Sequence, residues 1–160
     1  MTELRKGIVI FRCNANEKHG YAELEEISPK GPVRIHVRLE GFQTAGNRGF
    51  HIHRSGNTRC GSSSLCDHYN PTNQHHGDLN EVHSHMGDLG NLTANSKGII
   101  DQTLVADRIR LSGTRSVFGR SMIIHEDEDD LGRGHYKDSL VTGHSGKRIL
   151  YGIIAVDETC

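Results

Sequence analysis

The clearest pattern in the sequence is the alternation of apolar and polar residues from Val33 to Leu39, which predicts a β-strand with one buried face. Runs rich in β-branched residues predict further strands at 7–12, 21–27, 49–53, 98–105, 108–111, 116–125 and 148–156. No segment has a sustained helical period, and the sequence contains no internal repeat. We therefore expect an all-β protein, an eight-stranded antiparallel Greek-key sandwich or barrel. The 160 residues are enough for one domain with a real core, spanning 1–160.

Two long polar segments interrupt the strands, at residues 54–87 and 126–147. Apolar residues are sparse in the first, where Gly, Ser, Asn, Asp and His dominate. A loop of this length inside a compact domain is usually functional or disordered. Because the first loop carries metal-ligand residue types at intervals, a bound metal could order it.

Charge and hydropathy narrow the classes of partner. The formal net charge of −1 argues against binding to nucleic acid or a membrane surface through bulk charge. No apolar run approaches the roughly 18–20 residues of a membrane span. The segment from Met1 to Lys6 is not followed by the apolar core of a signal peptide. We expect a cytoplasmic protein with neither nucleic acid nor membrane as partner.

Four cysteines are irregularly spaced and form no C-x-x-C pair, namely Cys13, Cys60, Cys66 and Cys160. This spacing suits neither a zinc finger nor a dense disulfide framework. Cys60 and Cys66 enclose a short Gly/Ser loop and could form a local disulfide. Free cytosolic thiols are an equally good interpretation.

Histidine carries the strongest chemical signal. His51 and His53 flank Ile52, so on a strand both rings project from the same face. Further ligand-type residues follow at His68, His76, His85, Asp88 and His125. Six imidazoles and one carboxylate can hold two metal ions, and nitrogen-rich sets suit copper, zinc, iron or nickel rather than calcium or magnesium. We interpret His19, His36, His135 and His144 as solvated, whereas spacing alone leaves His75 and His83 open as ligands.

These motifs resemble copper/zinc superoxide dismutase, and they keep the spacing of that family through both loops. The matching stretches are 49–53, 68–71, 76–77, 85–91, 119–126, 129–132 and 143–148, so the similarity covers nearly the whole chain. The resemblance implies an enzyme that dismutates superoxide to dioxygen and hydrogen peroxide with a redox-cycling copper ion beside a structural zinc ion. It also implies a homodimer, to which the apolar final strand, 149–156, can contribute.

The resemblance assigns copper to His51, His53, His68 and His125, and zinc to His68, His76, His85 and Asp88. His68 would bridge the two ions, and the matching favours His76 over His75 and His85 over His83. Three imidazoles and a carboxylate form a closed four-coordinate zinc site, which is typical of structural zinc. Four imidazoles leave copper able to change its geometry, as redox cycling requires.

Other family residues match individual positions. Asp129 corresponds to the aspartate that accepts hydrogen bonds from one ligand of each metal, here His51 and His76. Arg148 corresponds to the arginine at the active-site mouth, where a guanidinium offers donors to a small anion. Thr142 would narrow the same channel. His68 would also be catalytic, because on reduction it would release copper, take up a proton and deliver it in the next half-cycle.

The chain departs from the family at two places. The two cysteines of the family disulfide fall on Ser62 and Tyr151, so that bridge cannot form, and Cys60 with Cys66 could supply a substitute. In the second loop Lys137 replaces an acid and Val141 replaces a lysine, which makes steering of the anion depend more heavily on Arg148. A metal chaperone or zinc-only domain is the alternative function, but such relatives often lose copper ligands, and all four are present here.

Overall fold

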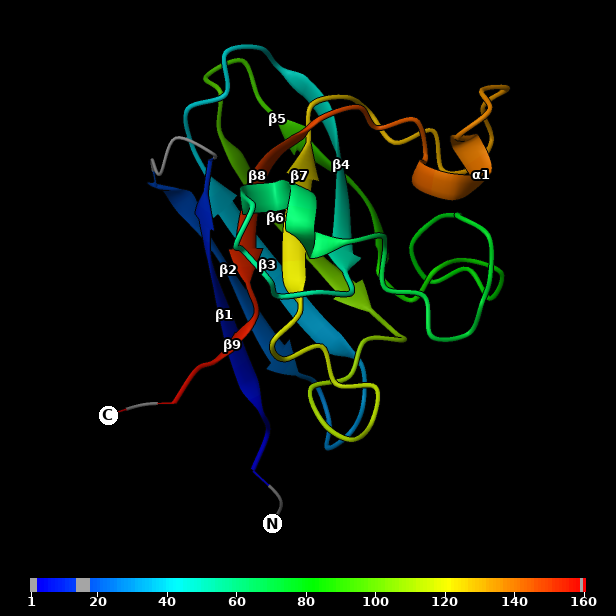
Figure 1. The fold of residues 1–160 in the computed structure, drawn as a ribbon. Helices are drawn as coiled ribbons and strands as arrows, with labels where there is room; N and C mark the ends of the chain where they lie inside the picture. The colour runs from blue at the N-terminus through cyan, green and yellow to red at the C-terminus, as the bar shows by residue number, and fades with distance from the viewer. Residues whose placement is uncertain (1–2, 14–17, 159) are drawn as a thin grey trace.

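The computed structural model describes residues 3–13, 18–158 and 160, and it is almost entirely β-structure (Figure 1). The strands are β1 (Lys6–Arg12), β2 (Lys18–Glu26), β3 (Val33–Leu39), β4 (Gly46–His53), β5 (Asp88–Ala94), β6 (Ile100–Ala106), β7 (Ser121–His125), β8 (Arg148–Ile153) and the short β9 (Ala155–Val156). A 3-10 helix, η1 (Gly61–Leu65), and a single α-helical turn, α1 (Ser139–Thr142), lie in the two long loops. No helix in the described part of the chain is long and apolar enough to cross a membrane.

The strands form one antiparallel sheet in the order β5-β4-β7-β8-β1-β2-β3-β6, with β9 beside β1. The β3–β4 and β6–β7 connections cross between the two halves of the sheet, so the all-β Greek-key prediction is confirmed. The sheet curls into a nearly closed barrel. Its two end strands, β5 and β6, are joined through the Gln102 side chain, whose Oε1 accepts from the Thr93 N–H at 3.0 Å. Its Nε2 donates to the Asn91 carbonyl at 3.1 Å.

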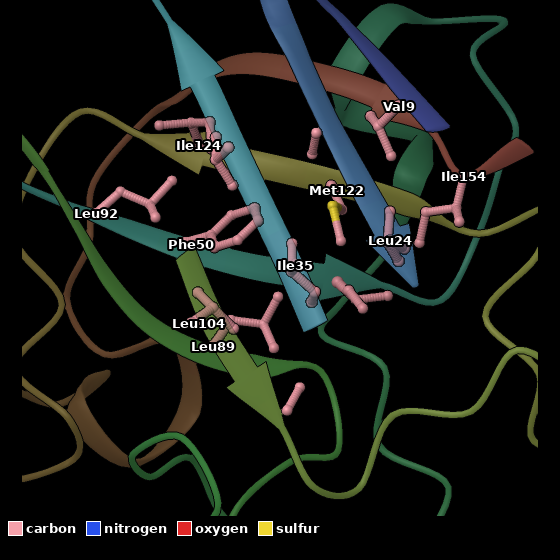
Figure 2. Packing of buried hydrophobic residues seen from close by; sticks show 14 of the residues in the cluster. Val9, Leu24, Ile35, Phe50, Leu89, Leu92, Leu104, Met122, Ile124 and Ile154 are labelled. Atoms are coloured by element: carbon pink, nitrogen blue, oxygen red, sulfur yellow. The ribbon is translucent and has the colours of Figure 1, made fainter. Parts of the chain in front are cut away.

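Alternation along the strands builds the core. Val33, Ile35, Val37 and Leu39 are fully buried, as the period of two predicts. Figure 2 shows Ile35 and Phe50 among the side chains packed inside the barrel. In β4 the core residues Phe50 and Ile52 alternate with His51 and His53, and all four are buried. The two histidines therefore lie on the outer face of the barrel wall, where loop residues rather than solvent cover them.

Two strand predictions need correction. Residues 108–111 are not a strand, although Ile109 and Leu111 are buried, because these side chains anchor an irregular loop in the core. Residues 116–120 also lie outside β7. Conversely, β5 was missed because Gly90 and Asn91 interrupt its apolar pattern.

The two long loops pack against each other on one side of the barrel, where α1 lies beside the segment that precedes β5 (Figure 1). The His76 N–H donates to the Leu140 carbonyl at 2.9 Å, which joins one loop to the other. The first loop also follows the end of β4, because the Tyr69 N–H donates to the Ile52 carbonyl at 2.8 Å. These contacts bring chemically active residues from both loops onto the outer face of β4.

Candidate metal centre

Seven predicted ligand residues meet on the outer face of β4. His51 and His53 belong to β4, His125 ends β7, Asp88 begins β5, and His68, His76 and His85 come from the loop that precedes β5. None of these residues is more than 7% exposed. Burying so many polar side chains is unfavourable unless each finds a partner, so their convergence indicates a site that holds charge.

Three imidazoles converge on one carboxylate oxygen. Asp88 Oδ1 lies 3.0 Å from the Nδ1 atoms of His68 and His76, and 3.1 Å from Nδ1 of His85. The other oxygen, Oδ2, accepts backbone N–H groups from Gly77 and His85 at 3.0 Å each. A tetrahedral zinc ion with bonds of about 2.0 Å separates its ligand atoms by about 3.3 Å. The spacing and the three-nitrogen, one-oxygen donor set therefore fit zinc.

A second group consists only of histidines, namely His51, His53, His68 and His125. Their potential ligand atoms all lie within 4.8 Å of one another. The His51 ring stacks on the His68 ring, with centroids 3.9 Å apart. An all-imidazole donor set suits a redox-active copper ion. The ligand atoms of His51, His68, His76 and Asp88 also all lie within 4.8 Å of one another, so this set is directly adjacent to the all-histidine group and overlaps it at His51 and His68.

In four of the six rings, one nitrogen has no hydrogen-bond partner within the described residues. Nδ1 of His53 donates to the Cys66 carbonyl at 2.7 Å, and Nδ1 of His125 donates to the Gly146 carbonyl at 3.1 Å. Because a carbonyl only accepts, the opposite nitrogen, Nε2, is the unprotonated one in the neutral ring. Buried histidine nitrogens without a hydrogen-bond partner in the described structure are His51 Nδ1, His53 Nε2, His76 Nδ1 and His125 Nε2. A bound metal ion would satisfy these orphaned nitrogens.

Asp129 orients one ring from each group. Its Oδ2 accepts from His51 Nε2 at 2.5 Å, and its Oδ1 accepts from His76 Nε2 at 2.7 Å. These are the two contacts that the resemblance implies. The carboxylate is 1% exposed, so it fixes the tautomer of both rings from inside the protein.

The histidines of the two groups differ in pKa and therefore in protonation at neutral pH. Burial, helped by the charge of neighbouring histidines, holds the pKa of His51 and His53 well below the ordinary value and lowers that of His125 to about 4. Burial also lowers the pKa of His76, but the hydrogen bond to Asp129 and the nearby Asp88 carboxylate outweigh it and raise the pKa to about 9. At neutral pH the histidines of the all-histidine group therefore offer free lone pairs, whereas a metal must displace a proton from His76.

A cavity of about 530 Å³ leads to the site from solvent. His68, His125, Thr142 and Arg148 are among its lining residues, so the structure brings the predicted channel residues together with the ligands. The guanidinium of Arg148 donates to the carbonyls of Ser62 and Cys66 at 2.7 Å each. Burial lowers the pKa of Arg148 from its ordinary value, although a guanidinium still carries its charge at any physiological pH.

The substitute disulfide is wrong, because Cys60 and Cys66 are free thiols that flank η1. The Cys66 sulfur lies 3.8 Å from the Ser64 carbonyl oxygen. Cys66 has φ 64° and ψ −157°, a backbone conformation found almost only in glycine. Its carbonyl accepts from both His53 and Arg148, and these hydrogen bonds hold the loop without a covalent link.

The open histidines lie outside both groups. His75 and His83 are exposed, and their rings contact the His76 carbonyl and the Gln74 side chain respectively. Of the histidines interpreted as solvated, His135 and His144 are also exposed.

Two residues that support the site were not predicted. Asn91 holds the Asp129 backbone, accepting its N–H at 2.8 Å and donating to its carbonyl at 3.0 Å. Gly143 has φ 71°, and a Cβ there would lie 2.1 Å from Asp129 Oδ1 and 2.5 Å from His76 Nε2. Only glycine leaves room for the hydrogen bond between Asp129 and His76. The glycine at position 143 was the one sign of this role in the sequence.

A β-barrel that gathers six buried histidines and a buried aspartate into adjacent, overlapping groups defines a class, a metalloprotein with two adjacent metal sites. Comparison with known proteins makes the class specific. The family model for copper/zinc superoxide dismutase matches residues 18–154. This chain belongs to the copper/zinc superoxide dismutase family.

Curated relatives agree with this placement. The chain is 46% identical to an extracellular superoxide dismutase [Cu-Zn] of Drosophila melanogaster over 124 residues, which cover 78% of this chain and 68% of that protein. It is 35% identical to a superoxide dismutase [Cu-Zn] of Yarrowia lipolytica over 94% of this chain and 97% of that protein. A superoxide dismutase [Cu-Zn] of Schizosaccharomyces pombe is 39% identical over 86% of this chain and 89% of its own length.

Proposed function

We propose that this protein is an oxidoreductase that converts superoxide to dioxygen and hydrogen peroxide. The observation that carries the proposal is the pair of ligand groups that share His68 at the base of a cavity with Arg148 on its wall. When bound, copper supplies the redox chemistry by taking one electron from one superoxide anion and giving it to a second, with two protons completing the peroxide. The residues of this chain hold the metals, select the anion and transfer the proton.

The assignment of ligands follows the donor atoms. His51 Nδ1, His53 Nε2 and His125 Nε2 are orphaned nitrogens that would hold copper together with His68. His68 Nδ1, His76 Nδ1, His85 Nδ1 and one oxygen of Asp88 would hold zinc. Asp129 fixes His51 and His76 in the tautomers that these assignments need.

Arg148 and Thr142 select the substrate. Among the residues that the structure describes, the guanidinium of Arg148 hydrogen-bonds to two carbonyls and to no carboxylate, so its charge remains available to an anion in the cavity. Thr142 Oγ1 is engaged with Asp138, which keeps the side chain fixed at the cavity wall. A fixed cation beside a narrow wall favours a small monovalent anion over larger ones.

His68 handles a proton. Its Nδ1 lies against Asp88 and His85, so Nε2 is the ring nitrogen on the side of the all-histidine group. In the proposed cycle His68 takes up a proton at Nε2 and delivers it to the peroxide that forms. The Asp88 contact holds the ring in place while Nε2 changes its protonation.

Metal analysis combined with a direct superoxide assay tests the function. The purified protein, loaded with copper and zinc, should contain both metals and should remove superoxide generated by pulse radiolysis with second-order kinetics. A protein that binds zinc alone and leaves superoxide unchanged would refute the proposal and favour a zinc-only or metal-carrier role.

The protein is proposed to act as a homodimer. The surface between β1 and β8 supports this, because a hollow there is lined by Ile8, Ile10, Tyr151 and Ile153. Ile10 is 43% exposed although it is apolar. Light scattering should give twice the chain mass for the parent, and Ile10→Glu should give the mass of one chain. A parent with the mass of a single chain would overturn the dimer.

A cytoplasmic location is also proposed, with neither nucleic acid nor membrane as partner. The free thiols of Cys60 and Cys66 and the net charge of −1 support it. Fractionation of the source cells should recover the protein with soluble cytoplasmic markers. Recovery from the medium would contradict the proposal.

A further inference from the structure

Arg54 is a second cationic residue of the cavity that leads to the metal centre. It directly follows His53 in the sequence, and it lines the cavity together with Arg148. Strand β4 ends at His53 and the chain bends at Arg54, so the alternation of the strand no longer dictates which way this side chain faces. A guanidinium is charged at any physiological pH. Two permanent cations therefore line the path to the metals.

The backbone of Arg54 is held on both sides, whereas its side chain is unengaged. The Arg54 N–H donates to the Asp67 carbonyl at 3.0 Å, and the Arg54 carbonyl accepts from Arg120 Nη1 at 2.8 Å. The residue is exposed, and within the part of the chain that the structure describes its guanidinium forms neither a hydrogen bond nor an ion pair. The charge of Arg54 is thus fixed near the cavity and remains available to an anion.

The charges along the cavity show why this cation matters. Two carboxylates, those of Asp67 and Asp138, line the cavity beside the guanidiniums of Arg54 and Arg148. Burial lowers the pKa of Arg148 and the charge of Asp67 acts in the opposite direction, so Asp67 lies near Arg148. With Arg54 present, the charged side chains of the lining balance. Without Arg54, they would leave one net negative charge, which repels an approaching anion.

Other charged groups near the mouth belong to the second loop and lie beside Asp138. His144 Nδ1 is 2.8 Å from Asp138 Oδ1, and the exposed Lys137 precedes Asp138 in the sequence. Neither of these two groups is among the described residues that line the cavity. Asp67 forms no ion pair within the described ranges, and Arg54 is joined to it through the backbone. The charge of Arg54 therefore acts mainly against that of Asp67.

We propose that Arg54 is a guiding residue for the substrate anion: it offsets Asp67 and, with Arg148, draws superoxide along the cavity to the metal centre. Arg54 acts through its charge and not by touching the reacting atoms, so its effect scales with the charge at position 54 and weakens as salt is added. The inference rests on the proposed function, since it concerns the approach of the same anion to the same site.

The test is a graded charge series at one position, Arg54→Lys, Arg54→Gln and Arg54→Glu. Arg59→Gln and Arg59→Glu are the matched controls, because they make the same charge changes at an exposed arginine of the same loop that is not among the cavity-lining residues. Each copper- and zinc-loaded protein is analysed for metal content and assayed for superoxide removal by pulse radiolysis at neutral pH. Azide, a small anion that coordinates Cu(II), is titrated by absorbance as a probe that does not depend on turnover.

We expect Arg54→Gln to remove superoxide about two- to fivefold more slowly than the parent at low ionic strength, because one charge is lost from a solvated cavity. Arg54→Glu changes the charge twice as much, so its rate should fall by about the square of that factor. Arg54→Lys should lie closer to the parent than Arg54→Gln does. Azide affinity should follow the same order, and metal content should not change. Both Arg59 variants should stay near the parent, and in about 0.5 M salt, where the Debye length is about 4 Å, the series should converge.

The failure of this inference is distinguishable from the failure of the proposed function. A parent whose azide affinity follows the charge at position 54 but which does not remove superoxide would refute the proposed function alone. An active parent whose rate and azide affinity are matched by Arg54→Gln and Arg54→Glu at low salt would overturn the role of Arg54. Equal losses in the Arg54 and Arg59 variants would also overturn it, because net charge and not the cavity would then set the rate.

Discussion

Replacement of Asp129 by asparagine is the sharpest test of how the two metal sites are built. The carboxylate is 1% exposed and accepts two ring N–H groups, from His51 Nε2 at 2.5 Å and from His76 Nε2 at 2.7 Å. Asparagine has the same shape but only one side-chain oxygen. One ring keeps an acceptor, and the other faces an N–H₂ group with its own N–H.

The size of the effect follows from that mismatch. A hydrogen bond to a charged group contributes about 1.5–3 kcal/mol, and the variant loses one such bond. If the loss appears in metal binding, the affinity falls by about 10–100-fold, which is also the usual range for groups that orient metal-bound histidines. The zinc site should suffer most when His76 loses its partner, because its Nδ1 then no longer has a fixed direction.

Competition with chelators of known affinity measures this for zinc and copper separately. Asp127→Asn is the matched control, because it removes an exposed carboxylate two residues away. Circular dichroism of the metal-free variant verifies that the barrel is intact. If Asp129→Asn retains both metals within twofold of the parent, Asp129 does not orient the ligands and the argument fails.

Three further outcomes are expected. Arg148→Ala should lower the rate of superoxide removal about tenfold or more without changing copper or zinc content, since charge steering is worth about 10–1000-fold and superoxide dismutase is a standard example of it; metal loss in parallel with activity would contradict a role in binding the anion. The metal-free protein should be most stable to urea near pH 6.5. His125 has a pKa of about 4, so its contribution to stability is complete above about pH 6.5 and falls by about 3 kcal/mol as the pH drops to 4. His76 has a pKa of about 9, so its contribution to stability is lost as the pH rises towards 9. A stability that changes in only one direction over this pH range would refute the assignment. Cys66→Gly should raise the free energy of unfolding by about 1 kcal/mol through relief of backbone strain, and Cys66→Ala should not, because φ 64° with ψ −157° suits only glycine; equal melting temperatures for the two variants would argue against strain.

The sequence predicted the parts of the fold that depend on short-range pattern. The alternation from Val33 to Leu39 identified β3 because one face of that strand is buried and the other is partly solvated. The same reasoning predicted that His51 and His53 share a face. It did not predict β5, because Gly90 and Asn91 interrupt the apolar pattern of that strand.

The sequence likewise predicted some residues of the metal centre and not others. Residue type and spacing were enough to select His51, His53 and His125, but the choice between adjacent histidines needed the family resemblance. In the structure His76 is buried and His75 is exposed, although they are neighbours in the sequence. The roles of Asn91 and Gly143 depend on segments about 40 and 15 residues away meeting at Asp129, and no local pattern contains that information.

The hydrogen bonds from Arg148 to the carbonyls of Ser62 and Cys66 join the first loop to β8, the two segments that a disulfide joins in the family. This link assembles as the barrel folds and needs no oxidant, and a reductant cannot cut it. Maturation of this enzyme should therefore be limited by the supply of copper and zinc and not by thiol oxidation. The metal-loaded protein should keep its full activity in millimolar dithiothreitol once the reductant has been removed.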